Sequence, residues 1–228
     1  MYVIMNKMNL KLVSICLLGI LSLFSCFHTK KMNHVSDSNL NGTNLSNSPV
    51  LENRFLIVNK NKTTSYNVND SIISDRVIVA LTDVKIKSSK GKINLVRREC
   101  AVFHFVESFE IMKGEYFEIS IKKNHPKPIQ PKVWYEPTKN KSVFENEDFR
   151  IFKEQLGAGE ERAFHSHLER LVVRLNKVQL TDPRFFPKGQ EGVGIQEPNT
   201  VKFAEPVEHV VKNLSNIPLF NIVLEFKP

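Results

Sequence analysis

Short runs of apolar residues, rich in valine, isoleucine, leucine and phenylalanine, recur along the chain from about residue 50 to the C-terminus. Many members of these runs are β-branched, and residues that favour turns, such as asparagine, proline, glycine and aspartate, stand between them. A short run of this kind, bounded by turn residues, is typical of a β-strand. We therefore expect an all-β protein.

The pattern of the first half returns in the second half. Segments of the two halves match at an offset of 94 residues, with small shifts toward the C-terminus. Because self-similarity at a fixed spacing indicates a repeated structural unit, we predict two β-rich halves of about eighty residues each. The matched pairs are 55–57 with 149–151, 75–81 with 169–175, 84–86 with 178–180, Phe103 with Phe203, and 116–119 with 219–222.

Histidines mark one stretch of the second half. His165 and His167 stand one residue apart, just before an apolar run, and His209 follows 42 residues after His167. In an extended chain alternate side chains share a face, so the first two imidazoles point the same way. Imidazole is the commonest protein ligand for a transition metal. The spacing therefore predicts part of a metal site, which His209 would complete.

These residues also carry a family resemblance. Gly159, five residues, and then His165, Ser166 and His167 resemble the first motif of the cupins, and His209 with Asn213 resembles the end of their second motif. The resemblance implies two tandem cupin-like jelly-roll (double-stranded β-helix) barrels, a bicupin, with a divalent transition metal inside the C-terminal barrel. The implied ligands are His165, His167 and His209, and the metal would be Fe(II), Zn, Mn or Ni.

The match to the motifs departs from the family pattern at two places. The glutamate ligand usual in the family falls on Leu171 or Val172, and its proline and glycine before the last histidine fall on Ala204 and Pro206. The motif is therefore a three-histidine variant, which resembles the iron site of the thiol dioxygenases. Three histidine ligands would leave positions on the metal open for water, substrate or oxygen.

The first half has no ligand residues at the matching positions. Opposite the three histidines stand Ser71, Ile73 and Phe109. We therefore predict a degenerate barrel over residues 51–125 with a filled interior, a proline-rich connector over 126–143 that contains Trp134, and the metal-site barrel over 144–228. Trp134 either pins the connector to the barrels or covers a ligand pocket.

The N-terminus predicts the compartment. Two lysines precede an apolar run, which ends at Leu23-Phe24-Ser25-Cys26 and resembles the bacterial lipobox. We predict a signal peptide over 1–25, then a lipidated Cys26 and a flexible polar tether over 26–50. The protein would be lipid-anchored in the bacterial cell envelope, facing the periplasm or the surface. An ordinary signal peptide or a membrane-anchored helix is the alternative.

The net charge of the chain and the positions of its arginines indicate which molecules it could bind. The chain has a formal net charge of +8, but its lysines and arginines are dispersed, so we expect no nucleic-acid partner. Arg162 and Arg174 have no counterpart in the first half and are candidates for binding an anionic small molecule. An oligomer is compatible with the sequence. The function is either a metal-dependent, oxygenase-like enzyme for a small molecule or a non-catalytic surface lipoprotein with a structural or vestigial metal site.

Overall fold

The computed structural model describes residues 48–62, 72–129, 140–181 and 192–228. The elements in these ranges are β-strands, which confirms the all-β prediction, and no helix long and apolar enough to cross a bilayer occurs among them. The predicted signal peptide, Cys26 and Trp134 lie outside the described residues.

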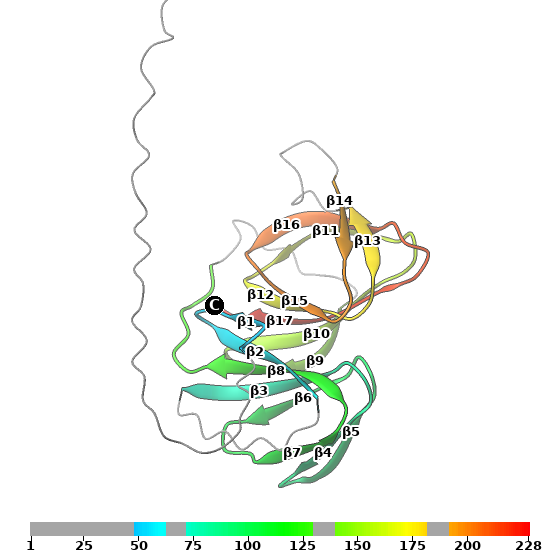
Figure 1. Cartoon of the computed structure of the whole chain (residues 1–228). Helices are drawn as coiled ribbons and strands as arrows, with labels where there is room; N and C mark the ends of the chain where they lie inside the picture. Colours follow the sequence, from blue (N-terminus) through cyan, green and yellow to red (C-terminus); the bar gives the residue numbers. More distant parts are fainter. Residues whose placement is uncertain (1–47, 63–71, 130–139, 182–191) are drawn as a thin grey trace, which may run out of the picture. The chain divides into compact units, whose positions relative to one another are not determined.

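The first half of the structure is made of two antiparallel sheets (Figure 1). The larger sheet has the order β1 (Leu51–Glu52), β2 (Leu56–Lys62), β8 (Glu115–Lys122), β3 (Ile73–Ala80) and β6 (Cys100–His104). The smaller sheet has the order β5 (Gly91–Leu95), β4 (Val84–Ser88) and β7 (Phe109–Lys113).

The second half repeats this plan, as the jelly-roll prediction requires. Its larger sheet has the order β15 (Thr200–Ala204), β12 (Arg170–Arg174), β17 (Leu219–Phe226), β10 (Phe149–Leu156) and β9 (Asn140–Glu145). Its smaller sheet has the order β11 (Glu161–His167), β16 (Val207–Asn213), β13 (Val178–Thr181) and β14 (Val193–Gln196). Strand β9 begins inside the stretch that was predicted as a connector.

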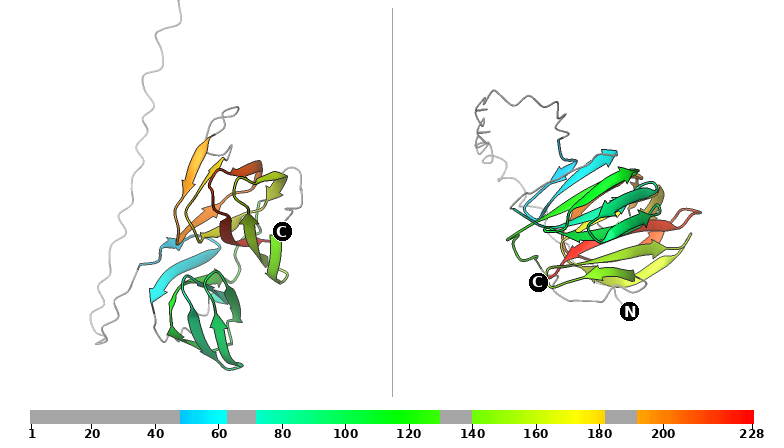
Figure 2. Two further views of the ribbon diagram at one scale, coloured as in Figure 1. Left: turned by 90° about the vertical axis from the view of Figure 1, so that its right-hand side faces the viewer. Right: turned by 90° about the horizontal axis from the view of Figure 1, so that it is seen from below.

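The two five-stranded sheets share one hydrophobic core, and Figure 2 shows their strands stacked as neighbouring layers. Alternate residues of β3 and of β12 face this core, for example Val77 and Val79 from the first barrel and Leu171 and Val173 from the second. Cys100 packs against the same core, and its burial raises the pKa of the thiol to about 11, as expected for a small apolar residue rather than a reactive nucleophile.

The interior of the first barrel is filled by apolar side chains, as predicted. A separate buried cluster includes Ile78, Ala80 and Tyr116, and the rings of Phe103 and Phe109 stack at 4.2 Å between centroids. Ser71 lies outside the described residues. The apolar packing leaves this barrel with a conventional hydrophobic core.

Strand registers correct the sequence alignment of the two halves. Arg76 pairs with Phe103, whereas the matching Arg170 pairs with Ala204, so Ala204 and not Phe203 is the counterpart of Phe103. A one-residue slip moves a side chain to the opposite face of a sheet, and Phe203 indeed packs on the core shared by the barrels. Apolar similarity alone could not detect the slip, because both faces of this strand meet apolar surroundings.

The last strand needs a second correction. Ala80 pairs with Tyr116, and Arg174, its counterpart in the second barrel, pairs with Asn221. Tyr116 therefore corresponds to Asn221 and not to Leu219. The sequence match of Tyr116 with Leu219 is wrong by two residues. A shift of two residues leaves each side chain on the same face of the strand, but it pairs the wrong side chains inside the two barrels.

Candidate metal centre

The histidines come from two neighbouring strands of the smaller sheet in the second barrel. His165 and His167 lie on β11, and His209 lies directly opposite His165 on β16. Before β11 the chain turns at Gly159, whose backbone has a φ of 69°, a left-handed conformation that glycine adopts without strain. The glycine of the sequence motif therefore sets the turn that starts the histidine strand.

A bulge in β11 shapes the site further. Between the pairs Arg162–Val211 and His165–His209, strand β11 has two residues where β16 has one. Arg162 and His165 would face opposite sides of a regular strand, but the extra residue lets both point inward, and both are buried. Within the bulge, the carbonyl oxygen of Ala163 lies 2.8 Å from Nδ1 of His165 and accepts its proton.

The three imidazoles form one compact, buried cluster. His165, His167 and His209 are 1%, 2% and 5% exposed, and each offers one ring nitrogen such that these atoms all lie within 4.8 Å of one another. The ring centroids of His165 and His209 are 4.5 Å apart, and those of His165 and His167 are 4.8 Å apart. Among the histidine, cysteine and carboxylate side chains of the described residues, these three are the ones close enough together to hold a metal ion.

The distance between two of the ring nitrogens tests whether a cation fits. Nε2 of His165 and Nε2 of His167 are 3.1 Å apart. Two nitrogens bound side by side to one ion at about 2.1 Å lie about 3 Å apart. His165 donates from Nδ1 to Ala163, so its Nε2 carries a lone pair.

Nδ1 of His167 has no hydrogen bond among the described residues, but a carboxylate lies close to it. A carboxylate oxygen of Glu225 lies 3.4 Å from Nδ1 of His167, which favours the proton on that nitrogen and leaves the lone pair on Nε2. Two lone pairs then face each other at 3.1 Å, an arrangement that a shared cation stabilises. The donor set and its orientation therefore fit a divalent transition metal.

The surroundings of His165 and His167 disfavour protonation of their imidazoles. Burial lowers the pKa of His165 to about 4, and it lowers the pKa of His167 well below its ordinary value. The positive charge of Arg170 adds to the effect at His167, and that of Arg162 adds to the effect at His165. Near neutral pH the rings of His165 and His167 are neutral, which is the form that binds metals.

Glu225 belongs to the site, although the sequence analysis missed it. Its side chain is fully buried; one oxygen accepts a hydrogen bond from the backbone of Leu168 at 2.7 Å, and the other pairs with Arg150 at 2.6 Å. These contacts hold the carboxylate beside His167. The usable signal was that Glu225 and Asn221 are the polar residues of an otherwise apolar strand and share one face of it.

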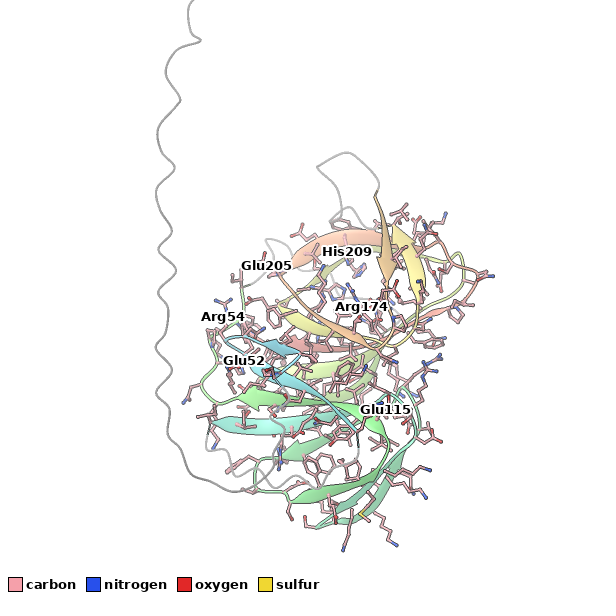
Figure 3. The ribbon with its side chains drawn as sticks, in the orientation of Figure 1. Glu52, Arg54, Glu115, Arg174, Glu205 and His209 are labelled. Carbon is pink, nitrogen blue, oxygen red and sulfur yellow. The ribbon has the colours of Figure 1, made fainter. Side chains whose placement is uncertain are left out.

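A cavity of about 70 Å³ adjoins the cluster inside the second barrel. His167 and His209 form part of its lining, together with three cationic side chains, and Figure 3 shows His209 and Arg174 within this barrel. The full lining is Glu154, His167, Arg170, Val172, Arg174, Leu180, Gly194, Ile195, Gln196, Lys202, Ala204, His209, Val211, Leu219 and Asn221.

The corrected alignment explains the open volume in the second barrel. Phe103 and Tyr116 fill the first barrel, and their counterparts Ala204 and Asn221 are smaller. Both smaller residues line the cavity. Two replaced aromatic rings therefore account for the open volume.

Arg162 and Arg174, the two predicted ligand-binding arginines, occupy different places. Arg174 lines the cavity. Arg162 is not part of that lining: its guanidinium is 1% exposed and donates to Glu154 at 3.0 Å, to Asn140 at 3.0 Å and to the carbonyl of Gln155 at 3.1 Å. Its donors therefore join β11 to β9 and β10.

Glu154 is a cavity residue that the sequence analysis missed. It accepts hydrogen bonds from Arg162 at 3.0 Å and Asn221 at 2.8 Å. Burial alone would raise the pKa of this carboxyl, but the charge of Arg162 and the hydrogen bond from Asn221 help to outweigh it, and the pKa is lowered. Glu154 is thus a carboxylate whose charge is balanced by Arg162, an arrangement that suits a hydrogen-bond acceptor better than a general base.

Residues next to the motif serve the fold. Glu169 accepts hydrogen bonds from Arg54 at 2.6 Å and from the backbone of Ile129 at 2.8 Å, so it connects the second barrel to the first half of the chain. Asn213 is fully buried and its amide donates to three backbone carbonyls around the β10–β11 and β16–β17 turns. His104, in the first barrel, pairs with Asp75 at 2.7 Å.

No protein-family model and no curated protein matches the sequence. Solved structures do match it. A cupin 2 conserved barrel domain protein from Leptotrichia buccalis has a TM-score of 0.51 at 11% identity, covering 78% of this chain and 86% of its own. AerE from Microcystis aeruginosa has a TM-score of 0.50 at 13% identity, covering 76% and 88%. A conserved protein of unknown function from Pseudomonas aeruginosa PAO1 has a TM-score of 0.50 at 10% identity, covering 78% and 83%.

At these identities the likeness establishes the fold. The matches cover 76% or more of this chain, so they extend over both barrels and not over one alone. Each half of the chain has the two-sheet, antiparallel plan of a jelly roll, and the second half gathers the three histidines of the motif inside it. The chain therefore has the cupin fold in its two-barrel form.

Proposed function

We propose that the protein binds a divalent transition metal through His165, His167 and His209 and presents it to a small molecule in the adjoining cavity. The observation that carries this proposal is the pair of Nε2 atoms 3.1 Å apart, with the carbonyl of Ala163 hydrogen-bonded to the other ring nitrogen of His165 and the Glu225 carboxylate 3.4 Å from that of His167. The cavity gives the ion a ligand-accessible side, because His167 and His209 are part of its lining.

A bound ion with three neutral protein ligands would supply Lewis acidity and open coordination positions. The chain's own residues orient the rings and exclude bulk water. Ala163 and Glu225 fix two imidazoles, and Phe152 stacks on His167 with centroids 6.3 Å apart. Iron(II), zinc, manganese and nickel are all compatible with three imidazoles, and metal analysis will identify the ion.

Metal analysis of the purified full-length chain tests the proposal. We expect one transition-metal ion per chain in the wild type and none in the double variant His165→Ala, His167→Ala. The matched control is His104→Ala, which removes a histidine outside the cluster and should keep the metal. Wild-type protein that holds no ion after incubation with iron(II), zinc, manganese and nickel would contradict the proposal.

The role of the ion separates two functions. The first is a metal-dependent, oxygenase-like enzyme, which the cavity beside the ion favours. Oxygen uptake by iron-loaded protein, screened against small thiols and phenols, should then depend on His165 and His167. The second is a non-catalytic ligand-binding or partner-binding protein, for which the same screen gives no turnover while ligand binding persists.

We also propose that the protein is tethered to the bacterial cell envelope by a lipid on Cys26. The lipobox-like sequence at residues 23–26 and the polar stretch after it support this proposal. Metabolic labelling with a radioactive fatty acid should mark the wild-type chain, and Cys26→Ser should abolish the label. An unlabelled wild-type chain that is recovered in the aqueous fraction would refute the lipid anchor.

A further inference from the structure

We infer that the cavity of the second barrel selects a small uncharged molecule with a hydroxyl group, whose proton is accepted by the side-chain oxygen of Gln196. This inference deepens the proposed function and rests on it. It names the class of ligand and the side chain that selects that class.

Gln196 is held at two points in the cavity wall. Its Nε2 donates to the backbone carbonyl of Asn176 at 3.1 Å and to Oδ1 of Asn221 at 2.9 Å. A backbone carbonyl can only accept a hydrogen bond, so the atom that faces Asn176 must be the amide nitrogen. Both hydrogens of this nitrogen are then used, and the orientation of the amide is fixed.

The orientation of Asn221 is fixed by a carboxylate. Its Nδ2 donates to Glu154 at 2.8 Å, and Glu154 also accepts from Arg162 at 3.0 Å. Burial raises the pKa of Glu154, but the charge of Arg162 helps to outweigh it and the pKa is lowered, so Glu154 is ionised and can only accept. Asn221 therefore turns its oxygen toward Gln196, and a flip of either amide would place two acceptors against each other.

The side-chain oxygen of Gln196, Oε1, is the acceptor that this network leaves for a ligand. It has no hydrogen-bond partner among the described residues, and it is not sealed inside the protein. Gln196 as a whole is 5% exposed and lines the cavity, so Oε1 faces the cavity rather than bulk solvent. A ligand that donates a proton satisfies this oxygen, whereas a ligand with acceptors alone leaves it unpaired.

The charged side chains of the lining do not require a charged ligand. Arg170 donates to two backbone carbonyls, and Arg174 and Lys202 each have an interaction of their own. Glu154 is balanced by Arg162. Because these charges already have partners, an uncharged molecule can enter without leaving an ion unpaired.

Apolar side chains and the volume limit the rest of the ligand. A hydrocarbon body fits the apolar part of the wall, which is formed by Val172, Leu180, Ile195, Val211 and Leu219. The volume of about 70 Å³ has room for about five water-sized groups, so the buried part of the ligand has about four to seven non-hydrogen atoms.

The repeat supplies an independent argument. Val84 pairs with Leu95 in the first barrel, and its counterpart Val178 pairs with Gln196 in the second. Leu95 packs in the apolar core of the first barrel, so the fold does not require an amide at this position. Asn221 likewise stands where the first barrel has Tyr116. The two amides that bond each other therefore both replace apolar core positions, as expected for groups that serve a ligand.

Titration of the zinc-loaded full-length chain with cyclopentanol and with cyclopentanone tests the inference, with each Kd measured from NMR chemical-shift changes of the protein. The two probes have the same ring and the same number of non-hydrogen atoms, but only the alcohol can donate a proton. Cyclopentanol should bind at least about 5-fold more tightly, because the ketone leaves Oε1 of Gln196 unpaired.

Gln196→Leu introduces the residue type of the corresponding first-barrel position and removes the acceptor. It should raise the Kd of cyclopentanol at least about 5-fold and abolish the preference for the alcohol, while the zinc content stays at one ion per chain. The matched control is Gln179→Leu, at an exposed position of the neighbouring strand β13, which should keep the wild-type preference.

Three results would overturn the inference: equal affinity of the wild type for the two probes, a preference for the alcohol that persists in Gln196→Leu, or no cyclopentanol binding at concentrations up to about 0.1 M. The comparison of the two probes in the wild type decides the question even if Gln196→Leu does not fold.

Failure of the metal proposal gives a different result. If the wild-type chain takes up no zinc, the proposed function fails, and the same titrations of the metal-free chain decide the hydroxyl site alone. A preference for cyclopentanol that depends on Gln196 in that experiment would support the site, and equal binding of the two probes would refute it.

Discussion

At the scale of single residues, the metal site depends on which nitrogen of each imidazole carries a proton. A hydrogen bond to the carbonyl of Ala163 determines this for His165, and the negative charge of Glu225, 3.4 Å from Nδ1, favours the same tautomer for His167. Both partners lie outside the histidine motif, one in a bulge and the other on the last strand. A motif search finds the ligands, but the groups that orient them come from backbone geometry and from a distant strand.

The first prediction concerns the metal-free chain at acid pH. A histidine in the unfolded chain titrates near 6.5, whereas burial lowers the pKa of His165 to about 4 in the folded state. Below about pH 6.5, His165 therefore binds a proton in the unfolded chain but not in the folded chain. The free energy of unfolding should fall by about 2 kcal/mol between pH 7 and pH 5 for His165 alone, and this loss continues down to about pH 4.

Urea denaturation at both pH values, with a chelator present, measures this loss. His165→Gln has no group that titrates in this range and should show a smaller loss between pH 7 and pH 5 than the wild type. An equal loss in the variant would show that other groups cause it.

A second prediction concerns Glu225. Glu225→Gln preserves the shape of the side chain but removes the charge that faces Nδ1 of His167 and pairs with Arg150. Loss of a carboxylate that orients a metal-binding histidine should weaken metal binding about 10- to 100-fold. Competition with a chelator of known affinity measures the change. Glu145→Gln, at an exposed pair with Lys227, is the control and should bind the metal normally.

At the scale of elements, strand pairing determines how the motif residues are used. The bulge in β11 turns Arg162 inward beside the histidines, although their spacing in the sequence places Arg162 on the other face of a regular strand. Similarly, Glu154 on β10 and Asn221 on β17 meet because these strands are neighbours in the sheet. The histidines were predictable from i, i+2 spacing, whereas these polar partners follow from pairing between distant segments.

The turn before β11 gives a prediction at this scale. Gly159→Ala should lower the free energy of unfolding by about 1–2 kcal/mol, because alanine is strained in the left-handed conformation. No other atom lies within 4 Å of the added methyl group, so the loss is conformational and not steric. Gly159→Asn should lower the free energy of unfolding less than Gly159→Ala does, since asparagine tolerates this conformation. Thermal denaturation of both variants measures the difference, and equal stability of alanine variant and wild type would contradict it.

At the scale of the whole molecule, the largest apolar core lies between the two barrels and not inside either one. Residues from β2, β3 and β8 of the first barrel and from β10, β12 and β17 of the second contribute to it. The second barrel has only a small buried apolar cluster of its own among its described residues, because polar side chains occupy much of its interior. The first barrel therefore stabilises the second barrel, which holds the site, through the shared apolar core.

This arrangement predicts cooperative unfolding. Phe55 stacks on Phe203 at 5.3 Å and contacts Phe226 at 4.5 Å, so it belongs to the shared core. Phe55→Ala should lower the free energy of unfolding by about 3–5 kcal/mol. Because both barrels bury this core, they should unfold in one transition in calorimetry. Phe105→Ala, at a half-exposed position, should change stability little, and two separate transitions in the wild type would refute the coupling.

Sequence patterns were enough to predict the all-β class, the two-barrel repeat, the three histidines and the filled interior of the first barrel. These features depend on local spacing: alternation along a strand, one repeat offset, and a glycine at a turn. The folded structure was needed to show that Arg174 lines a cavity while Arg162 is held by Glu154, and that Ala204 and Asn221 replace two aromatic residues. Strand register decides these points, because a slip of one residue reverses the face of every side chain while leaving the apolar pattern almost unchanged.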